Sequence, residues 1–278
     1  MFNSHSIRSA VRGTSLAILL ILAAQAVLPG CAKEEELDPV PPPKIECPPG
    51  PQIGKTPPAA PRERAVSLGR SVRGEELKMY VLGEGGPVTF ILGGIHGDEG
   101  VSAAVAQKFL DLLRRDPSLC RGRTVAILPR ANPDGLAANT RVNAHGVDCN
   151  RNFPASNWDK SSAGRYNGGT APGTEPETKA ILKAVATLQP SRIISIHAIS
   201  GGKQCNNWDG PAEDLARRMA AKNGYPAKGT IGYPTPGSMG SWAGIDKKIG
   251  MITLELPAAR SEDECWRDNR EALLEAIR

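Results

Sequence analysis

Histidine is scarce in this chain, with four among 278 residues and only three after the first 30. The six cysteines never form a CxxC pair, which argues against a zinc site built from cysteines. Basic and aromatic residues are not interleaved in the manner typical of nucleic-acid binding, so we expect no nucleic-acid partner. Any metal site must therefore draw on a few histidines and on carboxylates.

The first 30 residues lack acidic side chains. Arg8 and Arg12 precede an apolar run at 16–28 that is too short to span a bilayer comfortably, an order typical of a signal peptide. The run ends in LPGC, the pattern of a bacterial lipobox, so we expect residues 1–30 to be removed and Cys31 to be lipidated. An uncleaved membrane anchor and ordinary signal-peptidase cleavage remain alternatives.

A lipidated Cys31 would anchor the mature protein to the cell envelope, on the periplasmic face, with acyl chains sufficient for stable attachment. Ala32 follows without an evident retention signal, which favours the outer membrane. Residues 31–63 are dense in proline and are interpreted as a semi-rigid linker. Removal of residues 1–30 lowers the formal net charge from +5 to +3, which gives little support for a polyanionic partner. Five cysteines would remain beside the lipidated one, an odd number that cannot pair completely within one chain.

Residues 64–278 alternate between strand and helix patterns, and their length suits one catalytic domain with a single core. We expect a three-layer α/β/α sandwich with a mixed, mostly parallel central sheet. The strands are expected at 76–83, 87–94, 123–130, 191–199 and 250–257, and the helices at 100–114, 175–188, 211–224 and 262–278. A glycine-rich turn at 83–86 joins the first two strands. The irregular stretch 131–174 is too long for a simple connector and is therefore expected to be functional.

Two of the three remaining histidines follow apolar strand patterns. His96 and Glu99 lie in the turn after the strand at 87–94, and His197 lies in the strand at 191–199. Ligands bind at the carboxyl ends of strands in open α/β sheets, so the three side chains are expected at one rim. Two imidazoles and a carboxylate, with a fourth position left for water, are typical of a catalytic zinc site.

Glu255 is the one charged residue in the apolar segment MITLELP. A carboxylate in such a strand must be paired, neutral or functional. It is therefore either a member of a buried ion pair or a general base whose pKa is set by its surroundings.

The long loop supplies fixed positive charge through Arg141 and Arg151. One arginine near a metal can stabilise the oxyanion of a tetrahedral intermediate, and another can hold a substrate carboxylate through two parallel hydrogen bonds. Asn150, the residue before Arg151, could share in binding that carboxylate. Without a metal site nearby, the same arginines would be interpreted as solvated loop residues.

Five segments, taken in order, resemble the zinc carboxypeptidase family from about Val66 to the C-terminus. They are HGDE (96–99), PRANPDG (129–135), GVDCNRNFP (146–154), SIHA (195–198) and TLELP (253–257). HGDE alone is moderately specific, whereas the ordered set is highly specific. The segments NPDGLAANTRVN, WDGPAEDLA and TPGSMGSWAG are similar to murein peptide amidases, which cut the bond between γ-D-glutamate and diaminopimelate in cell-wall peptides.

The resemblance implies one Zn²⁺ per chain, held by His96, Glu99 and His197. It implies that Arg141 stabilises the oxyanion and that Glu255 is the general base.

The same resemblance implies that Asn150 and Arg151 bind the carboxylate of the leaving residue. Tyr233, in TIGYPTPG, resembles a mobile tyrosine that closes over substrate, although it is equally a plain loop tyrosine. Cys149 stands where an apolar residue is more usual, and its small apolar side chain does not disturb this interpretation.

The expected activity is a zinc metallopeptidase or amidase acting on a muropeptide such as murein tripeptide. Three alternatives stay open: an ordinary carboxypeptidase on protein C-termini, an N-acyl amino acid deacylase, and a non-catalytic lipoprotein that binds cell-wall peptide. The segments TPGSMGSWAG and TLELP argue against the deacylase. The complete set of ligand and arginine candidates, with Glu255, argues against a non-catalytic role.

Overall fold

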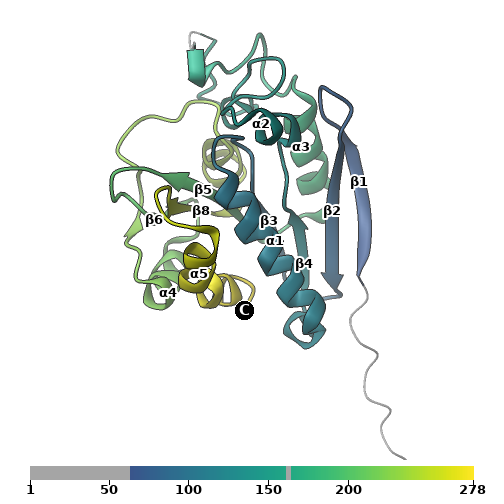
Figure 1. Ribbon diagram of the computed structural model, residues 1–278, viewed down its shortest axis with the longest axis vertical. Helices are drawn as coiled ribbons and strands as arrows, with labels where there is room; N and C mark the ends of the chain where they lie inside the picture. Colours follow the sequence, from purple (N-terminus) through teal and green to yellow (C-terminus); the bar gives the residue numbers. More distant parts are fainter. Residues whose placement is uncertain (1–62, 161–163) are drawn as a thin grey trace, which may run out of the picture. The chain divides into compact units, whose positions relative to one another are not determined.

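A computed structural model describes residues 63–160 and 164–278, whose strands form one eight-stranded mixed sheet (Figure 1). In spatial order the strands are β1 (Arg64–Arg70), β2 (Glu76–Gly83), β4 (Thr124–Leu128), β3 (Val88–Leu92), β5 (Arg192–Ile199), β8 (Gly250–Pro257), β6 (Cys205–Asp209) and β7 (Ala227–Lys228). The expected signal peptide, Cys31 and the proline-rich linker up to residue 62 lie outside the described residues.

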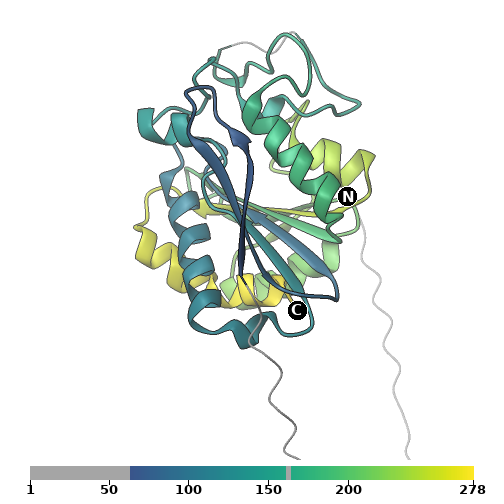
Figure 2. The ribbon, with the colours of Figure 1, turned by 90° about the vertical axis from the view of Figure 1, so that its right-hand side faces the viewer.

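Helices cover both faces of this sheet (Figure 2). One face packs against α1 (Gly100–Arg115), α4 (Glu213–Asn223) and α5 (Glu262–Ala276). The other packs against α3 (Pro176–Leu188) and the π-helical segment η4 (Gly240–Asp246). Alternate strand residues separate the two layers of core. The side chains that face α1 include Ile91 and Ile194, and those that face α3 include Phe90 and Ile193. The predicted three-layer α/β/α sandwich is therefore confirmed.

Local signals explain where several helices begin and end. Helix α5 starts with a capping box, in which the Ser261 hydroxyl accepts from the Glu264 N–H and the Glu264 carboxylate accepts from the Ser261 N–H. Helix α3 has Pro176 at its first position, where the missing N–H costs nothing. Helix α4 ends at Asn223 and is capped by Gly224, whose φ of +71° is the left-handed conformation that glycine adopts readily. No helix within residues 63–160 and 164–278 is long and apolar enough to cross a bilayer.

The structure contains elements that the sequence pattern did not predict. These are β1, β6, β7 and several short helices: α2 (Pro133–Ala138), η1 (Pro117–Cys120), η2 (Cys149–Arg151), η3 (Gly164–Tyr166) and η4. The glycine-rich turn does join β2 to β3, but these strands are not neighbours. Strand β4 lies between them, parallel to β3 and antiparallel to β2. The crossover through α1 returns the chain beside β3, and β2 then pairs with the other edge of β4.

Three neighbouring parallel strands position the candidate site. In the order β3, β5, β8, they end at the same edge of the sheet. His96 follows β3, whereas His197 and Glu255 are directly opposite each other on β5 and β8. Residues distant in sequence are thereby brought to one rim.

Candidate metal and active site

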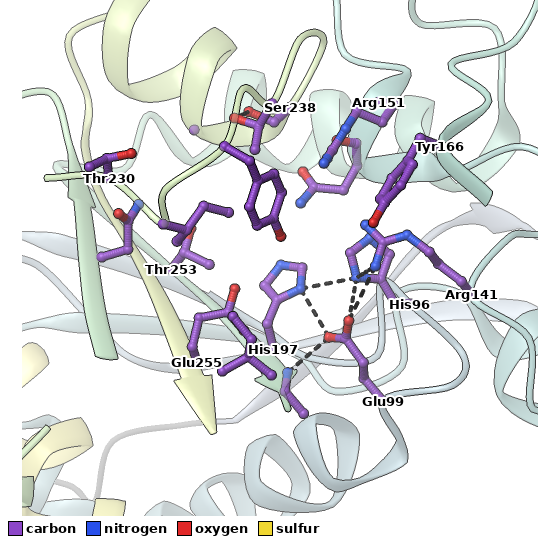
Figure 3. A pocket seen from close by; sticks show the side chains of 18 of the residues that line it. His96, Glu99, Arg141, Arg151, Tyr166, His197, Thr230, Ser238, Thr253 and Glu255 are labelled. Atoms are coloured by element: carbon purple, nitrogen blue, oxygen red, sulfur yellow. Dashed lines mark hydrogen bonds and ion pairs between the residues drawn. The ribbon is translucent and has the colours of Figure 1, made fainter. Parts of the chain in front are cut away.

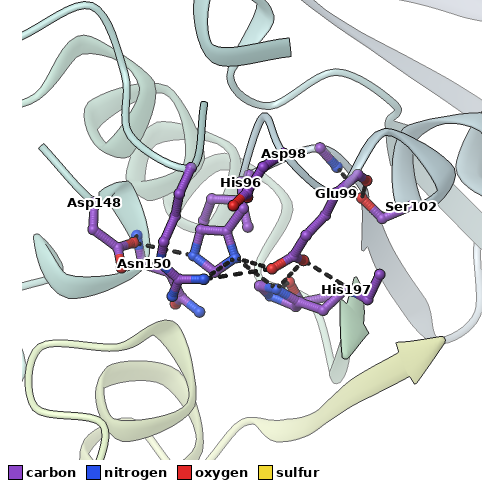
Figure 4. A network of polar contacts seen from close by, with 12 residues as sticks. His96, Asp98, Glu99, Ser102, Asp148, Asn150 and His197 are labelled. Atoms are coloured by element: carbon purple, nitrogen blue, oxygen red, sulfur yellow. Dashed lines mark hydrogen bonds and ion pairs between the residues drawn. The ribbon is translucent and has the colours of Figure 1, made fainter. Parts of the chain in front are cut away.

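The turn between β3 and α1 is held in place by glycines and one serine. A Cβ atom at Gly97 would lie 1.9 Å from the Gly135 carbonyl carbon, so only glycine allows the turn to pack against α2. The Ser102 hydroxyl donates to the Glu99 carbonyl at 2.7 Å and accepts from the Gly94 N–H at 2.9 Å (Figure 4). Both side chains of interest, His96 and Glu99, are therefore presented from a rigid turn.

The three predicted metal ligands converge in the cavity (Figure 3). His96 Nδ1 lies 2.8 Å from Glu99 Oε1, and His197 Nδ1 lies 3.1 Å from both Glu99 Oε2 and His96 Nδ1. Ligand atoms arranged tetrahedrally around zinc at about 2.1 Å are about 3.4 Å apart. The spacing and the two-nitrogen, one-carboxylate chemistry of these donors therefore fit a zinc ion, with only a small expansion.

Each histidine nitrogen that faces away from the cluster has a partner. His96 Nε2 lies 3.1 Å from Asp148 Oδ1, and His197 Nε2 lies 3.0 Å from Ser195 Oγ. The Ala198 N–H donates to Glu99 Oε2 at 2.9 Å. Such outer contacts fix the ring orientation and turn Nδ1 of each histidine toward Glu99, where the three donors would hold a metal.

The charges of the cluster are strongly coupled. Burial disfavours the protonated ring of His96, but the carboxylates of Glu99 and Asp148 outweigh burial and raise the pKa of His96 to about 9. Burial likewise opposes ionisation of Glu99, yet His96 and His197 hold the pKa of Glu99 well below its usual range. The site thus keeps its ligand carboxylate ionised at neutral pH, which suits a divalent cation.

Arg141 reaches the same cluster from the long loop. Its Nε donates to Asp148 Oδ2 at 2.9 Å, and its Nη1 lies 3.4 Å from Glu99 Oε1. The Tyr166 ring lies under the guanidinium, with 5.2 Å between the carbon Cζ and the ring centroid. Arg141 is therefore fixed beside the metal-ligand cluster, where an oxyanion would form on a bound carbonyl.

Asn150 and Arg151 lie in η2 and also line the cavity. The Asn150 side-chain oxygen accepts from the Met239 N–H at 2.9 Å, so its amide nitrogen remains available for a substrate acceptor. Arg151 donates from Nη1 to the Asn150 carbonyl at 2.7 Å, and burial lowers the pKa of this guanidinium without removing its charge. The pair therefore offers several donors to a carboxylate.

Glu255 is 6% exposed and lines the cavity beside His197 (Figure 3). No ion pair or hydrogen bond of its side chain occurs among residues 63–160 and 164–278, so the buried ion-pair alternative finds no support there. Burial raises the pKa of Glu255 above that of an ordinary glutamate, with the Glu99 charge acting in the same direction. An unpaired carboxylate with a raised pKa beside a metal cluster is suited to accept a proton.

Tyr233 lies on the loop between β7 and η4 and lines the cavity while 47% of it stays exposed. Burial raises the pKa of its phenol, with the Glu255 charge in support. The structure therefore brings Tyr233 to the site in a position from which it can contact a ligand. Its predicted closing movement stays a prediction.

The cavity that joins these residues has a volume of about 270 Å³. It also contains residues that sequence reasoning missed, namely Tyr166, Asn207 and Asp209, and Asp148 stands just behind it. Asp148 could have been found from sequence, because it lies two residues before Asn150 and a metal-binding histidine needs a polar partner. Asn207 and Asp209 gave no such signal, since the short polar strand CNNWD lacks an apolar pattern.

Comparison with known proteins identifies the class. Residues 60–206 match the family described as zinc carboxypeptidase, and this chain belongs to that family. Murein peptide amidase A of Escherichia coli (strain K12) is 36% identical over 185 residues, which cover 62% of this chain and 72% of that protein. The protein of the same name from Vibrio campbellii is 31% identical over 206 residues, which cover 69% of this chain and 79% of that protein.

Solved structures agree with the family assignment. The structure of murein-tripeptide amidase MpaA from Escherichia coli O157 matches with a TM-score of 0.63 and 31% identity, covering 79% of this chain and 97% of that one. Carboxypeptidase A from Helicoverpa armigera matches with a TM-score of 0.63 at 19% identity, covering 77% and 67%, and shows the shared fold alone. The predicted family, fold and hydrolytic activity are therefore confirmed. The family implies zinc, and the cluster of His96, Glu99 and His197 fits it.

Proposed function

We propose that this chain is a murein peptide amidase that hydrolyses the amide bond between γ-D-glutamate and diaminopimelate in cell-wall peptides. The main support is that one cavity contains three groups of residues suited to this reaction. They are a set of donors that fits zinc (His96, Glu99 and His197), the unpaired Glu255, and two residues able to bind a carboxylate, Asn150 and Arg151. Identity of 31–36% to proteins named murein peptide amidase A supports the choice of substrate. We further propose one zinc ion per chain, because the fitting cluster offers a single set of three donors.

The residues of the cavity suggest the order of events. The terminal carboxylate of the peptide docks on Arg151 and Asn150, which places the scissile carbonyl beside His96, Glu99 and His197. Zinc, when bound by these residues, supplies Lewis-acid polarisation of that carbonyl and lowers the pKa of water.

Glu255 accepts a proton from the attacking water, and Arg141 donates hydrogen bonds to the oxyanion as the tetrahedral centre forms. Glu255 then returns the proton to the leaving amine. Asp148 holds Arg141 and His96 in place throughout, since each of its carboxylate oxygens contacts one of them.

Product analysis by mass spectrometry tests this function. The purified domain is incubated with L-Ala-γ-D-Glu-meso-diaminopimelate and with an ordinary peptide of matched length. We expect free diaminopimelate from the first, loss of release after chelation, and recovery with added zinc. Release of the C-terminal residue only from the ordinary peptide would replace the amidase by a general carboxypeptidase.

We also propose that residues 1–30 direct export and that Cys31 carries the lipid anchor, with the linker to residue 63 spacing the enzyme from the outer membrane. The support is the basic start, the apolar run and the LPGC motif. The mass of the N-terminal peptide tests this proposal. A Cys31 without acyl groups in the full-length exported protein would contradict it.

A further inference from the structure

Tyr166 is an aromatic residue that lies outside the apolar core. It is 43% exposed and lines the cavity, and its hydroxyl has no hydrogen bond within residues 63–160 and 164–278. Three guanidiniums approach its ring, with the Cζ atoms of Arg141, Arg151 and Arg165 at 5.2, 5.5 and 5.6 Å from the ring centroid. All three distances are within the range of about 6 Å over which an aromatic face attracts a cation. The contacts of this ring are therefore with cations.

The backbone that follows Tyr166 is fixed against the segment that carries Arg151. The Asn167 carbonyl accepts from the Asp148 N–H at 2.8 Å. A Cβ at Gly168 would lie 2.7 Å from the Arg151 carbonyl oxygen, so the close approach of the two segments requires glycine. The position of the ring beside Arg151 is thus set by the fold of the loop.

Arg141 and Arg151 place two like charges in one cavity, and Figure 3 shows both beside the Tyr166 ring. Arg141 is held by Asp148. Arg151 is only 4% exposed and has no ion pair in the described part of the chain, where its one side-chain hydrogen bond goes to the Asn150 carbonyl. Burial lowers the pKa of Arg151, and the charge of Arg141 acts in the same direction, whereas Asp148 opposes both. Arg151 is therefore a buried cation that needs a favourable contact.

An aromatic ring meets this need in a way that a carboxylate would not. A carboxylate placed beside Arg151 would take up two N–H donors and would compete with the carboxylate of a substrate. An aromatic face attracts the guanidinium through the charge distribution of the ring and offers no strong hydrogen-bond acceptor. The donors of both arginines then stay available to substrate oxygens.

We propose that Tyr166 is a positioning residue, whose ring holds Arg141 and Arg151 at the spacing that the oxyanion and the terminal carboxylate require. It acts through these two arginines and takes no part in making or breaking bonds. The inference rests on the proposed function, which gives the two arginines their tasks. We assign no role to Arg165, because its side chain is 60% exposed and lies 3.5 Å from Asp98.

Two substitutions separate the ring of Tyr166 from its hydroxyl. Tyr166→Phe keeps the aromatic face and should hold kcat/KM for the murein tripeptide within about 2-fold of wild type. Tyr166→Leu keeps an apolar side chain without an aromatic face and should lower kcat/KM by about 10-fold, the loss expected for two such contacts. We expect KM to rise, because Arg151 is less well placed for the carboxylate, and kcat to fall, because Arg141 is less well placed for the oxyanion.

Tyr80→Leu is the matched control. The ring of Tyr80, on β2, lies 4.5 Å from Arg114 Cζ, and neither residue lines the cavity. The same substitution therefore removes a contact of the same kind outside the site, and kcat/KM should stay unchanged. Zinc content and the midpoint of urea unfolding are measured on every variant, so that folded and zinc-loaded proteins are compared.

A double-mutant cycle shows whether the ring acts through an arginine. In the Arg151→Met background only the contact with Arg141 is left to lose, so Tyr166→Leu should lower kcat/KM by about 3-fold instead of about 10-fold. A full 10-fold loss in that background would overturn the assignment to Arg151.

The remaining outcomes separate the inference from the proposed function. Wild-type kcat/KM in Tyr166→Leu would overturn the inference while leaving the amidase intact. An equal loss in Tyr166→Phe and Tyr166→Leu would assign the effect to the hydroxyl and would overturn it as well. Failure of the folded, zinc-loaded wild-type enzyme to hydrolyse any γ-D-glutamyl peptide would instead refute the amidase. Should Tyr166→Leu fail to fold, Tyr166→Met, which also lacks a ring, takes its place with the same expected loss.

Discussion

Replacement of Glu255 by glutamine tests the catalytic core with the smallest structural change. The side chain is buried at 6% exposure, and glutamine has nearly the same volume and shape. Glu255 is not a member of the cluster that fits zinc, so metal binding should persist. The change therefore removes one capability, the acceptance of a proton from the attacking water.

The expected loss of kcat/KM depends on whether another carboxylate near Glu255 could accept the proton in its place. Glu99, another carboxylate that lines the cavity, is engaged with both histidines, which hold its pKa low. Asp148 is committed to His96 and Arg141. With no replacement at hand, we expect a loss of about 1,000-fold in kcat/KM, or about 4 kcal/mol of transition-state stabilisation.

The assay is hydrolysis of the murein tripeptide, followed by mass spectrometry, with zinc content measured on the same preparation. Glu271→Gln, on the exposed face of α5, is the matched control and should keep full activity. Retention of more than a tenth of wild-type kcat/KM by Glu255→Gln, at full zinc content, would refute the assignment of the base. Loss of zinc together with activity would mean that Glu255 supports the metal site itself.

Three further predictions follow from the geometry. Asp148→Asn removes the carboxylate that contacts His96 Nε2, so zinc affinity should fall about 10- to 100-fold in competition with a chromophoric chelator; unchanged affinity would contradict this role. Burial raises the pKa of Glu255, and only its carboxylate form can act as base. The value of kcat/KM should therefore fall on acidification, with a midpoint above pH 4.5, the pKa of an ordinary glutamate. A midpoint at or below pH 4.5 would contradict the raised pKa. Gly97→Ala places a Cβ against the Gly135 backbone and should lower the free energy of unfolding by about 1–3 kcal/mol in urea titration, whereas Gly100→Ala, with open space around its Cβ, should be neutral or stabilising.

The alternation of strand and helix patterns was sufficient to predict the layers of the fold. Strands β3, β5 and β8 are apolar on both faces because helices cover both, and their patterns were plain in the sequence. Strand β6 was not predicted because its sequence, CNNWD, is polar. Asn207 and Asp209 line the cavity, so the strand lacks the apolar pattern of a core strand. The position of β4 between β2 and β3 depends on the crossover through α1, which sequence periodicity does not encode.

Site residues could be predicted from the sequence when two conditions held: the side chain is a typical metal ligand, and it lies at or just after the end of an apolar strand pattern. His96, Glu99 and His197 met both conditions, and the structure brings them together. Asp148, Asn207 and Asp209 are polar but do not follow an apolar strand pattern, so nothing in the sequence pattern placed them at the site. That Asn207 Oδ1 is buried without a hydrogen-bond partner in the described part of the chain can be recognised only from the three-dimensional structure.

The carboxylates around the cavity divide into two groups according to their surroundings. Burial opposes the ionisation of all four, but His96 and its neighbours hold the pKa values of Glu99 and Asp148 low. Burial raises the pKa values of Glu255 and Asp209, and neither carboxylate has an ion-pair partner among the described residues to offset it. Environments that move similar groups in opposite directions assign them different tasks. The first group carries its charge in the ligand-free site, whereas a raised pKa makes the second group better able to take up a proton, as the proposed role of Glu255 requires.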